Sequence, residues 1–431
     1  MSTWRATFKA RLDIFPNLGY SEVVKILIVN SLYPPYVLGG AERSVQDLAE
    51  ALAAQDIEIV VASTVGRGGA STKVVNGVKV VHLPIANLYW PFDRVIRSPA
   101  HRKLWHLIDA YNPAMKAAVA RLIRQERPSV VHTNNLQGIS VAAWRAASAA
   151  RIPILHTLHD YYLTCARCSR YRDGYSCDRT CWGCLPFLLA RRRAAACVAG
   201  VVGVSRFILD HHCDRGFFGG AKFRSVIRHV CPPAVRLRTA DSTASPVTFG
   251  YLGRLTPEKG VNLLLDTFAA RSDGGWRLLV AGEEADEGYR RSLGQRVAGM
   301  RDRSAIRFLG WVDPVQFFTQ IDVLLVPSLW QEPLPRVIQE AYTAGVPIVG
   351  SRRGGIPELI EDSVTGLLFD PDVPKTLSAV VDRILEDRSV AGRLGQNARR
   401  RARENAPEHI VEEYRNAYRA VLGSATEAPP V

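Results

Sequence analysis

The sequence predicts an α/β fold with two parallel sheets. Short β-branched runs alternate with longer segments of helical periodicity along most of the 431 residues, which is typical of sheets built from βαβ units. The length favours two domains over one. A stretch rich in Pro, Ser and Thr from Cys231 to Pro246 interrupts the alternation, so we expect one sheet on each side of it.

The first domain is expected to cover residues 23–235. Apolar residues between Val45 and Ala53 recur at helical spacing, which predicts a helix packed on the sheet. The expected strands of this domain are Lys25–Asn30, Ile57–Ala62, Val78–Leu83, Val130–Thr133, Ile154–Leu158 and Val198–Val204.

The second domain is expected to cover residues 236–405, followed by a C-terminal helix and tail at 406–431 that could pack on either domain. Ligands of open α/β sheets bind beyond the carboxyl ends of the strands, so two such sheets facing each other would enclose a cleft. The expected strands are Val247–Leu252, Arg277–Ala281, Ile306–Leu309, Val323–Pro327, Pro347–Gly350 and Gly366–Phe369.

Residues 1–22 are interpreted as a basic amphipathic extension. Trp4, Phe8, Leu12 and Phe15 recur at three- and four-residue intervals among basic residues, so this segment could lie on a membrane or form a plain extension. It lacks the uninterrupted apolar segment of a secretion signal, and apolar runs elsewhere are shorter than the roughly 20 residues that span a bilayer. We expect a cytoplasmic protein, which could be peripheral at the inner face of the membrane.

The charge balance favours an anionic partner. Lys and Arg total 55 against 41 Asp and Glu, a formal net charge of +14, which suits lipid headgroups, phosphorylated ligands or nucleic acid. The basic residues lack interleaved aromatics on one element, so no nucleic-acid partner is expected.

A glycine-rich phrase at 250–260 follows one expected strand and leads into a helix. Its glycines would let the backbone approach a ligand, and Arg254 and Lys259 could place two cations on an anion such as pyrophosphate near the helix start. A tight turn with two surface cations is the alternative interpretation.

Glu332 and Glu340 stand eight residues apart, with Pro335 near the start of a helix that runs to about Ala344. If all eight residues were helical, the carboxylates would lie about 12 Å apart along the axis. Pairs that flank one glycosidic bond lie within about 10 Å, so two contacts at different ends of one extended ligand are favoured. Two ordinary glutamates on a solvated helix are the alternative.

These motifs closely resemble those of glycosyltransferase family four, whose members have the GT-B architecture of two facing Rossmann-like, doubly wound domains with an interdomain cleft. The resemblance extends weakly into the first half through Tyr33-Pro34-Pro35 and Gly39-Gly40-Ala41-Glu42. In the second half it is carried by Gly253-Arg254-Leu255, Glu258-Lys259-Gly260, Glu332, Glu340, Ala344-Gly345-Val346-Pro347, Gly354-Gly355-Ile356-Pro357-Glu358 and Gly366-Leu367-Leu368-Phe369.

The resemblance implies retaining transfer of a sugar from a UDP- or GDP-sugar to a glycan or lipid-linked acceptor, without an obligatory divalent metal. It implies that Arg254 and Lys259 hold the donor pyrophosphate, that Glu340 binds the ribose and that Glu332 binds the transferred sugar. Backbone at Leu334, Pro335, Arg336 and Val337 would also face the donor, as would the Gly39-Gly40 turn. The family often has glycine at position 335, so Pro335 removes one expected amide contact.

Four polar residues of the first half are candidates for contacts to the donor sugar or the acceptor. His132 and Asn134 lie at the end of one expected strand, and His159 and Asp160 at the end of the next, where site residues of α/β sheets are found. We rank His159 with the catalytic candidates, although a buried structural role for His132 is equally compatible with the sequence.

Five cysteines cluster in a loop at residues 165–184. In a cytosolic chain such clustering indicates metal before disulfides, and Cys165, Cys177, Cys181 and Cys184 could form a tetrahedral structural zinc site. Free thiols, a disulfide or an iron-sulfur site remain the alternatives.

Two rival functions stay open at this point. One is a nucleotide-sugar epimerase or phosphorylase on the same fold, and the other is a non-catalytic basic protein with a zinc module.

Overall fold

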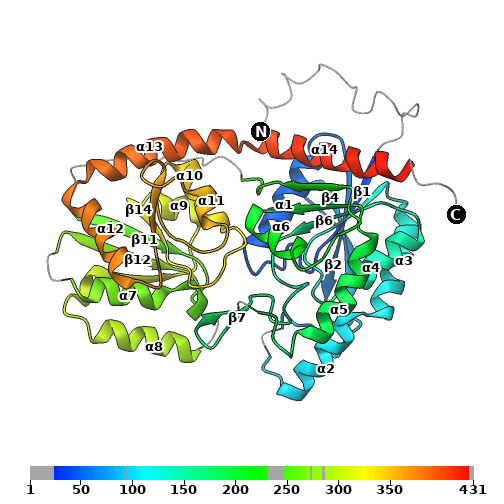
Figure 1. The fold of residues 1–431 in the computed structure, drawn as a ribbon, viewed down its shortest axis with the longest axis horizontal. Coiled ribbons are helices and arrows are strands. Elements are labelled where there is room, and N and C mark those ends of the chain that lie inside the picture. Colours follow the sequence, from blue (N-terminus) through cyan, green and yellow to red (C-terminus); the bar gives the residue numbers. More distant parts are fainter. Residues whose placement is uncertain are drawn as a thin grey trace.

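The computed structural model describes residues 24–93, 95–177, 179–231, 246–271, 274–283 and 287–426. Two parallel sheets, each covered by helices, form two halves that lie side by side (Figure 1). The α/β, GT-B-type architecture expected from the sequence is confirmed. The proposed extension at 1–22 and the proposed boundary at 235/236 lie outside the described residues.

The first sheet has eight strands in the order β10-β9-β6-β5-β1-β2-β4-β3. All neighbours are parallel except β3, which pairs antiparallel with β4. The strands are β1 (Lys25–Val29), β2 (Glu58–Val65), β3 (Ser71–Val75), β4 (Val78–Pro84), β5 (Val130–Thr133), β6 (Ile154–Leu158), β9 (Gly200–Gly203) and β10 (Phe223–Val226). The helices are α1 (Gly40–Ala53), α2 (Pro99–Ala110), α3 (Pro113–Glu126), α4 (Ala142–Ala149), α5 (Leu185–Ala194) and α6 (Arg206–Cys213).

The second sheet has six parallel strands in the order β13-β12-β11-β14-β15-β16. They are β11 (Val247–Leu252), β12 (Trp276–Ala281), β13 (Ile306–Gly310), β14 (Val323–Val326), β15 (Ile348–Ser351) and β16 (Gly366–Phe369). The helices are α7 (Val261–Ala269), α8 (Glu287–Ala298), α9 (Pro314–Phe318), α10 (Arg336–Ala344), α11 (Ile356–Leu359), α12 (Pro374–Glu386) and α13 (Ser389–Glu404).

Strand order reverses once in each sheet, between β1 and β5 and between β11 and β14. Ligands of doubly wound sheets bind in the crevice at such a reversal. The loops after these strands therefore locate the candidate site.

Every strand expected from the sequence is present, but four others were missed. β3 and β10 are edge strands with no fully buried residue, and polar and apolar residues alternate or mix within them, so they lack the apolar runs of the central strands. β7 (Tyr171–Arg172) and β8 (Tyr175–Ser176) form a short hairpin within the cysteine-rich loop. Strands of two residues carry no periodicity for a sequence to reveal.

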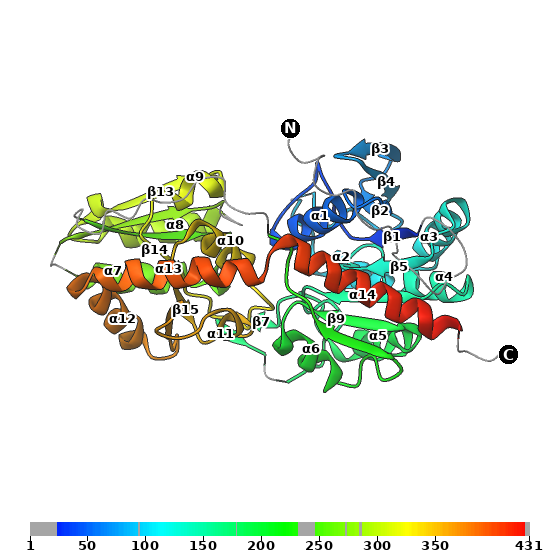
Figure 2. The same ribbon diagram turned by 90° about the horizontal axis from the view of Figure 1, so that it is seen from above.

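The last helix, α14 (Pro407–Thr426), returns to the first half of the chain. Figure 2 shows α13 along the second half and α14 along the first. Tyr414, Tyr418 and Val421 of α14 are buried in one cluster with residues of β1, β5 and β6. The sequence did not show on which domain the C-terminal helix packs, and the structure shows that it packs on the first sheet.

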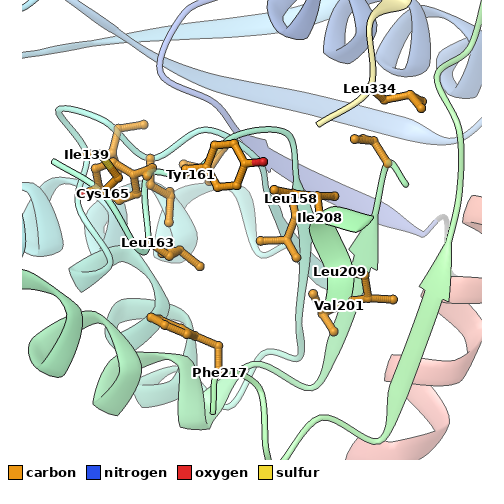
Figure 3. Close-up of a cluster of buried hydrophobic side chains, with 14 of the residues drawn as sticks. Ile139, Leu158, Tyr161, Leu163, Cys165, Val201, Ile208, Leu209, Phe217 and Leu334 are labelled. Carbon is orange, nitrogen blue, oxygen red and sulfur yellow. The ribbon is translucent and has the colours of Figure 1, made fainter. Parts of the chain in front are cut away.

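Apolar contacts join the two halves beside the crevice. Leu334, from the loop before α10, belongs to the same buried cluster as Leu158, Tyr161 and Ile208 of the first half (Figure 3). The hydroxyl of Tyr161 also donates to the backbone carbonyl of Gln331 at 2.7 Å. The loop that carries Glu332 is therefore held by both halves.

Candidate active site

Lys259 and Glu332 meet at the carboxyl edge of the second sheet. Lys259 ends a short 3-10 helix after β11, and its Nζ lies 2.5 Å from Oε1 of Glu332. Ser328, just after β14, donates to the same oxygen at 2.8 Å. The Glu332 side chain is buried, and the ammonium also lies over the ring of Trp330. A cation and a carboxylate are thus paired where the strand order reverses.

Gly260, which follows Lys259, has a backbone that only glycine fits. Its φ is +77°, and a Cβ there would lie 2.0 Å from the carbonyl oxygen of Pro327. This close approach brings the turn after β11 against the end of β14.

Arg254 is exposed in the turn after β11 and acts across the crevice on Glu42 in the first turn of α1. Burial raises the pKa of Glu42, whereas backbone hydrogen bonds around Gly39 and the charge of Arg254 oppose this rise. The sequence motif contained Glu42, but we assigned it no role. The structure places its carboxylate among the backbone amides at the start of α1.

The starts of α1 and α10 approach each other closely. A Cβ on Gly40 would lie 3.4 Å from Cβ of Arg336, the first residue of α10. Gly39 caps α1 and Pro335 caps α10. Two helix starts with partial positive charge therefore converge, which suits an anion between them.

Arg336 links the two halves through its side chain. Its guanidinium lies 2.5 Å from the carboxylate of Asp47 on α1 and 2.6 Å from that of Glu340 on α10. It also donates to Ser44 and to the backbone carbonyl of Val230. Sequence reasoning gave Arg336 a backbone role and missed this buried ionic junction, because Asp47 lies almost three hundred residues away.

The eight-residue spacing of the two glutamates has a different geometry from the one expected. α10 begins at Arg336, so Glu332 lies in the preceding loop and the helical separation of about 12 Å does not apply. Glu332 contacts Lys259, and Glu340 contacts Arg336. Between them, Leu334 is buried and Val337 is half-buried.

His159 and Asn134 come together from neighbouring strands. They follow β6 and β5, and Nε2 of His159 lies 3.0 Å from Oδ1 of Asn134. Because Oδ1 is an acceptor, Nε2 carries the proton and Nδ1 remains an acceptor. Nδ1 of His159 and Nδ2 of Asn134 are both buried without a hydrogen-bond partner. Buried polar atoms are nearly always satisfied, so this pair offers one acceptor and one donor to a ligand.

Burial lowers the pKa of His159 to about 4. The imidazole is therefore neutral near pH 7. Its ring stacks on that of His229, with 5.7 Å between centroids and 6° between planes. His229 was not a sequence candidate, and no motif indicated it.

Asp160 follows His159, and its Oδ1 accepts a hydrogen bond from the amide of Tyr162 at 2.8 Å. Burial raises the pKa of this carboxyl to about 6, and the charge of Glu42 adds to the rise. Two acidic groups of the first half, Asp160 and Glu42, thus lie close enough for the charge of Glu42 to act on Asp160.

His132 has no hydrogen bond to His159, Asn134 or Asp160. Both ring nitrogens are engaged, at 2.8 Å from Thr157 and at 2.8 Å from the hydroxyl of Tyr418 on α14. Burial lowers its pKa to about 3. His132 has no ring atom free for a ligand, and it ties α14 to the sheet.

The cysteine-rich loop brings three thiols together. Cys184 hydrogen-bonds both Cys165 and Cys181, whereas burial and the charges of Cys165 and Cys181 raise the pKa of Cys177 without a hydrogen bond to it. All of these cysteines are free thiols in the structure. Among the described residues, no group of three or more His, Cys, Asp or Glu side chains is arranged so that it could hold a metal ion. The structural zinc site at Cys165, Cys177, Cys181 and Cys184 stays a prediction.

Two family models together match most of the chain. The model described as "Glycosyl transferases group 1" matches residues 240–401, and the one described as "Glycosyltransferase Family 4" matches residues 38–224. A protein of Klebsiella pneumoniae, described as an uncharacterized 42.6 kDa protein in the cps region, is 34% identical over 78% of this chain and 87% of its own length. The chain belongs to the group 1 glycosyltransferases of family four.

Two other relatives of this glycosyltransferase have names that refer to glycan synthesis. The glycogen synthase of Mycobacterium tuberculosis is 28% identical over 88% of this chain and 90% of its own length. The lipopolysaccharide core biosynthesis glycosyltransferase LpsE of Rhizobium meliloti is 25% identical over 83% and 89%.

Solved structures show the same fold. Sucrose-phosphate synthase from Thermosynechococcus elongatus matches with a TM-score of 0.73 at 20% identity, covering 93% of this chain and all of that chain. Anabaena HepE in complex with UDP-glucose matches with a TM-score of 0.68 at 20% identity, covering 93% and 99%. The glycosyltransferase is thus an enzyme of GT-B architecture, and the non-catalytic rival is set aside.

No helix in the part of this glycosyltransferase that the structure describes is both long and apolar enough to cross a bilayer.

Proposed function

We propose that this enzyme is a retaining hexosyltransferase that moves a sugar from a UDP- or GDP-sugar to a glycan or lipid-linked acceptor, in cell-surface polysaccharide or glycolipid synthesis. The observation that carries the proposal is the Lys259–Glu332 pair at the strand reversal, with Nζ and Oε1 2.5 Å apart. Lys259 follows β11, and Glu332 lies in the loop that precedes α10. The relatives named for the cps region and for lipopolysaccharide core synthesis support this product class.

The donor diphosphate would lie between the cations and the two converging helix starts. Lys259 and Arg254 would neutralise the charge that develops on the leaving group, and the amides near Gly40 and Arg336 would add favourable dipoles. In this role Lys259 would exchange part of its contact with Glu332 for a phosphate oxygen. No divalent metal is needed for this charge neutralisation.

The sugar would lie between Glu332 and His159, and the ribose near Glu340. Glu332 would accept hydrogen bonds from sugar hydroxyls, and the free Nδ1 of His159 would accept one more. Glu340 would bind the ribose through its second carboxylate oxygen, because Oε1 is held by Arg336. Acceptor contacts would come from the first half, beside Asn134 and Asp160.

The donor proposal is tested by titration of the full chain with a panel of UDP- and GDP-sugars. We expect one donor to bind in the micromolar range, and Lys259→Ala and Arg254→Ala each to weaken it at least ten-fold, because each removes a charged hydrogen bond of about 1.5–3 kcal/mol. Lys73→Ala on β3 and Arg277→Ala on β12 are matched controls and should bind like the wild type. If no sugar nucleotide binds at millimolar concentration, the donor site as described is wrong.

Product analysis distinguishes transfer from the rival chemistries on this fold. A transferase yields free nucleoside diphosphate together with an elongated acceptor whose new linkage keeps the donor's anomeric configuration. An epimerised sugar nucleotide, or a sugar phosphate formed from inorganic phosphate, would instead support the epimerase or the phosphorylase.

A further inference from the structure

Helix α2 carries apolar side chains on the face that it turns to solvent. Leu104 and Leu107 are exposed, the latter at 58%, whereas Trp105 and Asp109 on the other face are buried. Ile96, just before the helix, is 97% exposed. Exposed leucines are ordinary when single, but a row at helical spacing marks an interaction surface.

Helix α5 also carries exposed apolar side chains. Leu185 and Leu189 are exposed at positions four residues apart, and Trp182, just before the helix, is 90% exposed. α5 packs beside α2, and the rings of Phe187 and His106 are in contact, with 6.2 Å between centroids. Both helices lie on the side of the first half away from α14, towards the β7–β8 hairpin (Figure 1). We call the set Ile96, Leu104, Leu107, Trp182, Leu185 and Leu189 the α2–α5 face.

Exposed charge on helices α2 and α5 themselves has one sign. Arg102 and Lys103 on α2 and Arg192 and Arg193 on α5 are exposed. The one acidic residue of α2, Asp109, is buried, and α5 has none. The face is therefore an apolar strip with a basic border.

An open hollow adjoins the end of α5. It measures about 360 Å³ and is lined by apolar atoms of Leu189 and Phe218, by Gly219 and Gly220, and by Arg192 and Arg193. Two guanidinium groups beside an apolar wall suit a phosphate that is attached to a hydrocarbon chain.

We propose that the α2–α5 face docks on a bilayer that contains anionic lipids. The apolar side chains would enter the interfacial region, Trp182 would lie at the headgroup level, and the basic border would face lipid phosphates. A second copy of the chain is a poorer partner, because a symmetric contact would set one basic border against the other. The inference rests on the proposed function in one respect: it would hold the crevice close to a lipid-linked acceptor.

The test is co-sedimentation of the full chain with vesicles. We expect binding to vesicles of phosphatidylcholine and phosphatidylglycerol at 3:1, and at least ten-fold weaker binding to phosphatidylcholine alone or in high salt. Two double variants, Leu107→Glu with Leu189→Glu and Arg192→Glu with Arg193→Glu, should each weaken binding at least ten-fold. Val74→Glu is the matched control, because Val74 is a similarly exposed aliphatic residue on β3, and it should bind like the wild type.

Donor titration and thermal melts of the same variants separate the possible outcomes. Variants that melt and bind the sugar nucleotide like the wild type but do not bind vesicles support the inference. It is overturned if both double variants bind vesicles as the wild type does, if the wild type binds none, or if sedimentation velocity shows a dimer that the variants abolish. If the wild type binds vesicles but no sugar nucleotide, the proposed function is overturned, whereas the inference of membrane docking is not.

Discussion

His159 and His229 stack face to face beside the loop that carries Glu332, with 6° between their ring planes. His229 hydrogen-bonds the backbone of Leu334, and its own carbonyl accepts from Gln339 on α10 at 3.3 Å. One imidazole of the candidate site is thus aligned by another that is tied to the donor loop.

We expect His229→Ala to lower kcat about ten-fold, with little change in donor affinity, because positioning of His159 is lost while the phosphate contacts remain. His229→Phe should restore part of the rate, since it keeps a flat ring against His159. Steady-state kinetics and donor titration are the measurements. Equal kcat for His229→Ala and the wild type would show that the stack has no part in turnover.

The Arg336–Asp47 ion pair should contribute to stability across the two halves. Asp47→Ala removes a carboxylate from a buried guanidinium, and we expect a loss of about 1–3 kcal/mol, below the 3–5 kcal/mol of fully buried pairs because the Asp47 side chain is 21% exposed. Urea unfolding measures this. Asp266→Ala is the control, since its partner Arg296 is also exposed and surface pairs contribute about 0–1 kcal/mol. If Asp47→Ala and Asp266→Ala lose the same free energy of unfolding, the Arg336–Asp47 pair contributes no more than a surface pair, and the prediction is wrong.

Asp160 should make stability depend on pH. Its pKa is raised to about 6 in the folded chain and is about 3.9 when unfolded. The folded state therefore holds this proton more tightly, so stability falls as pH rises from about 4 to 6 and stays lower above that range. Asp160→Asn removes the cost of the buried charge and should stabilise the enzyme by about 1–3 kcal/mol at pH 8, with a smaller gain at pH 5. Unfolding curves of both proteins at the two pH values provide the check, and an equal gain at both would rule out the shift.

Transfer should not need a divalent cation. Because Arg254 and Lys259 supply the positive charge, the rate in excess EDTA should match the rate with added Mg²⁺. A rate that EDTA abolishes and Mg²⁺ restores would show that a metal takes part in catalysis.

The cysteine cluster gives a direct test of the zinc prediction. A structural zinc requires one zinc per chain by elemental analysis, a lower melting temperature after chelation, and loss of the metal in Cys184→Ser. Cys213→Ser, outside the loop, should keep it. A metal-free protein with reactive thiols at these positions would instead establish the free-thiol alternative.

The fold was accessible from the sequence because its signals are local. Buried parallel strands appear in the sequence as short apolar runs: the expected strands Lys25–Asn30 and Val323–Pro327 each end one residue beyond the observed strands. The two sheets followed from the interruption between them. β3 and β10 were missed because these edge strands mix polar with apolar residues and so contain no apolar run.

The glycosyltransferase family was also accessible from the sequence, because its motifs keep fixed spacings within single loops. Contacts between residues that are distant in the sequence could not be predicted in this way. His132 and His159 look alike in the sequence, yet His132 is enclosed by Tyr418 while His159 keeps one nitrogen free.

The sequence by itself determined the alternation of strands and helices and the residue types of the donor motifs. Both depend only on residues that are close together along the chain. Only the tertiary structure decided which histidine keeps a free nitrogen, that Arg336 joins two helices across the halves, and that α2 packs beside α5. Each of these depends on which distant surface packs against a residue, and burial and pairing are properties of that packing.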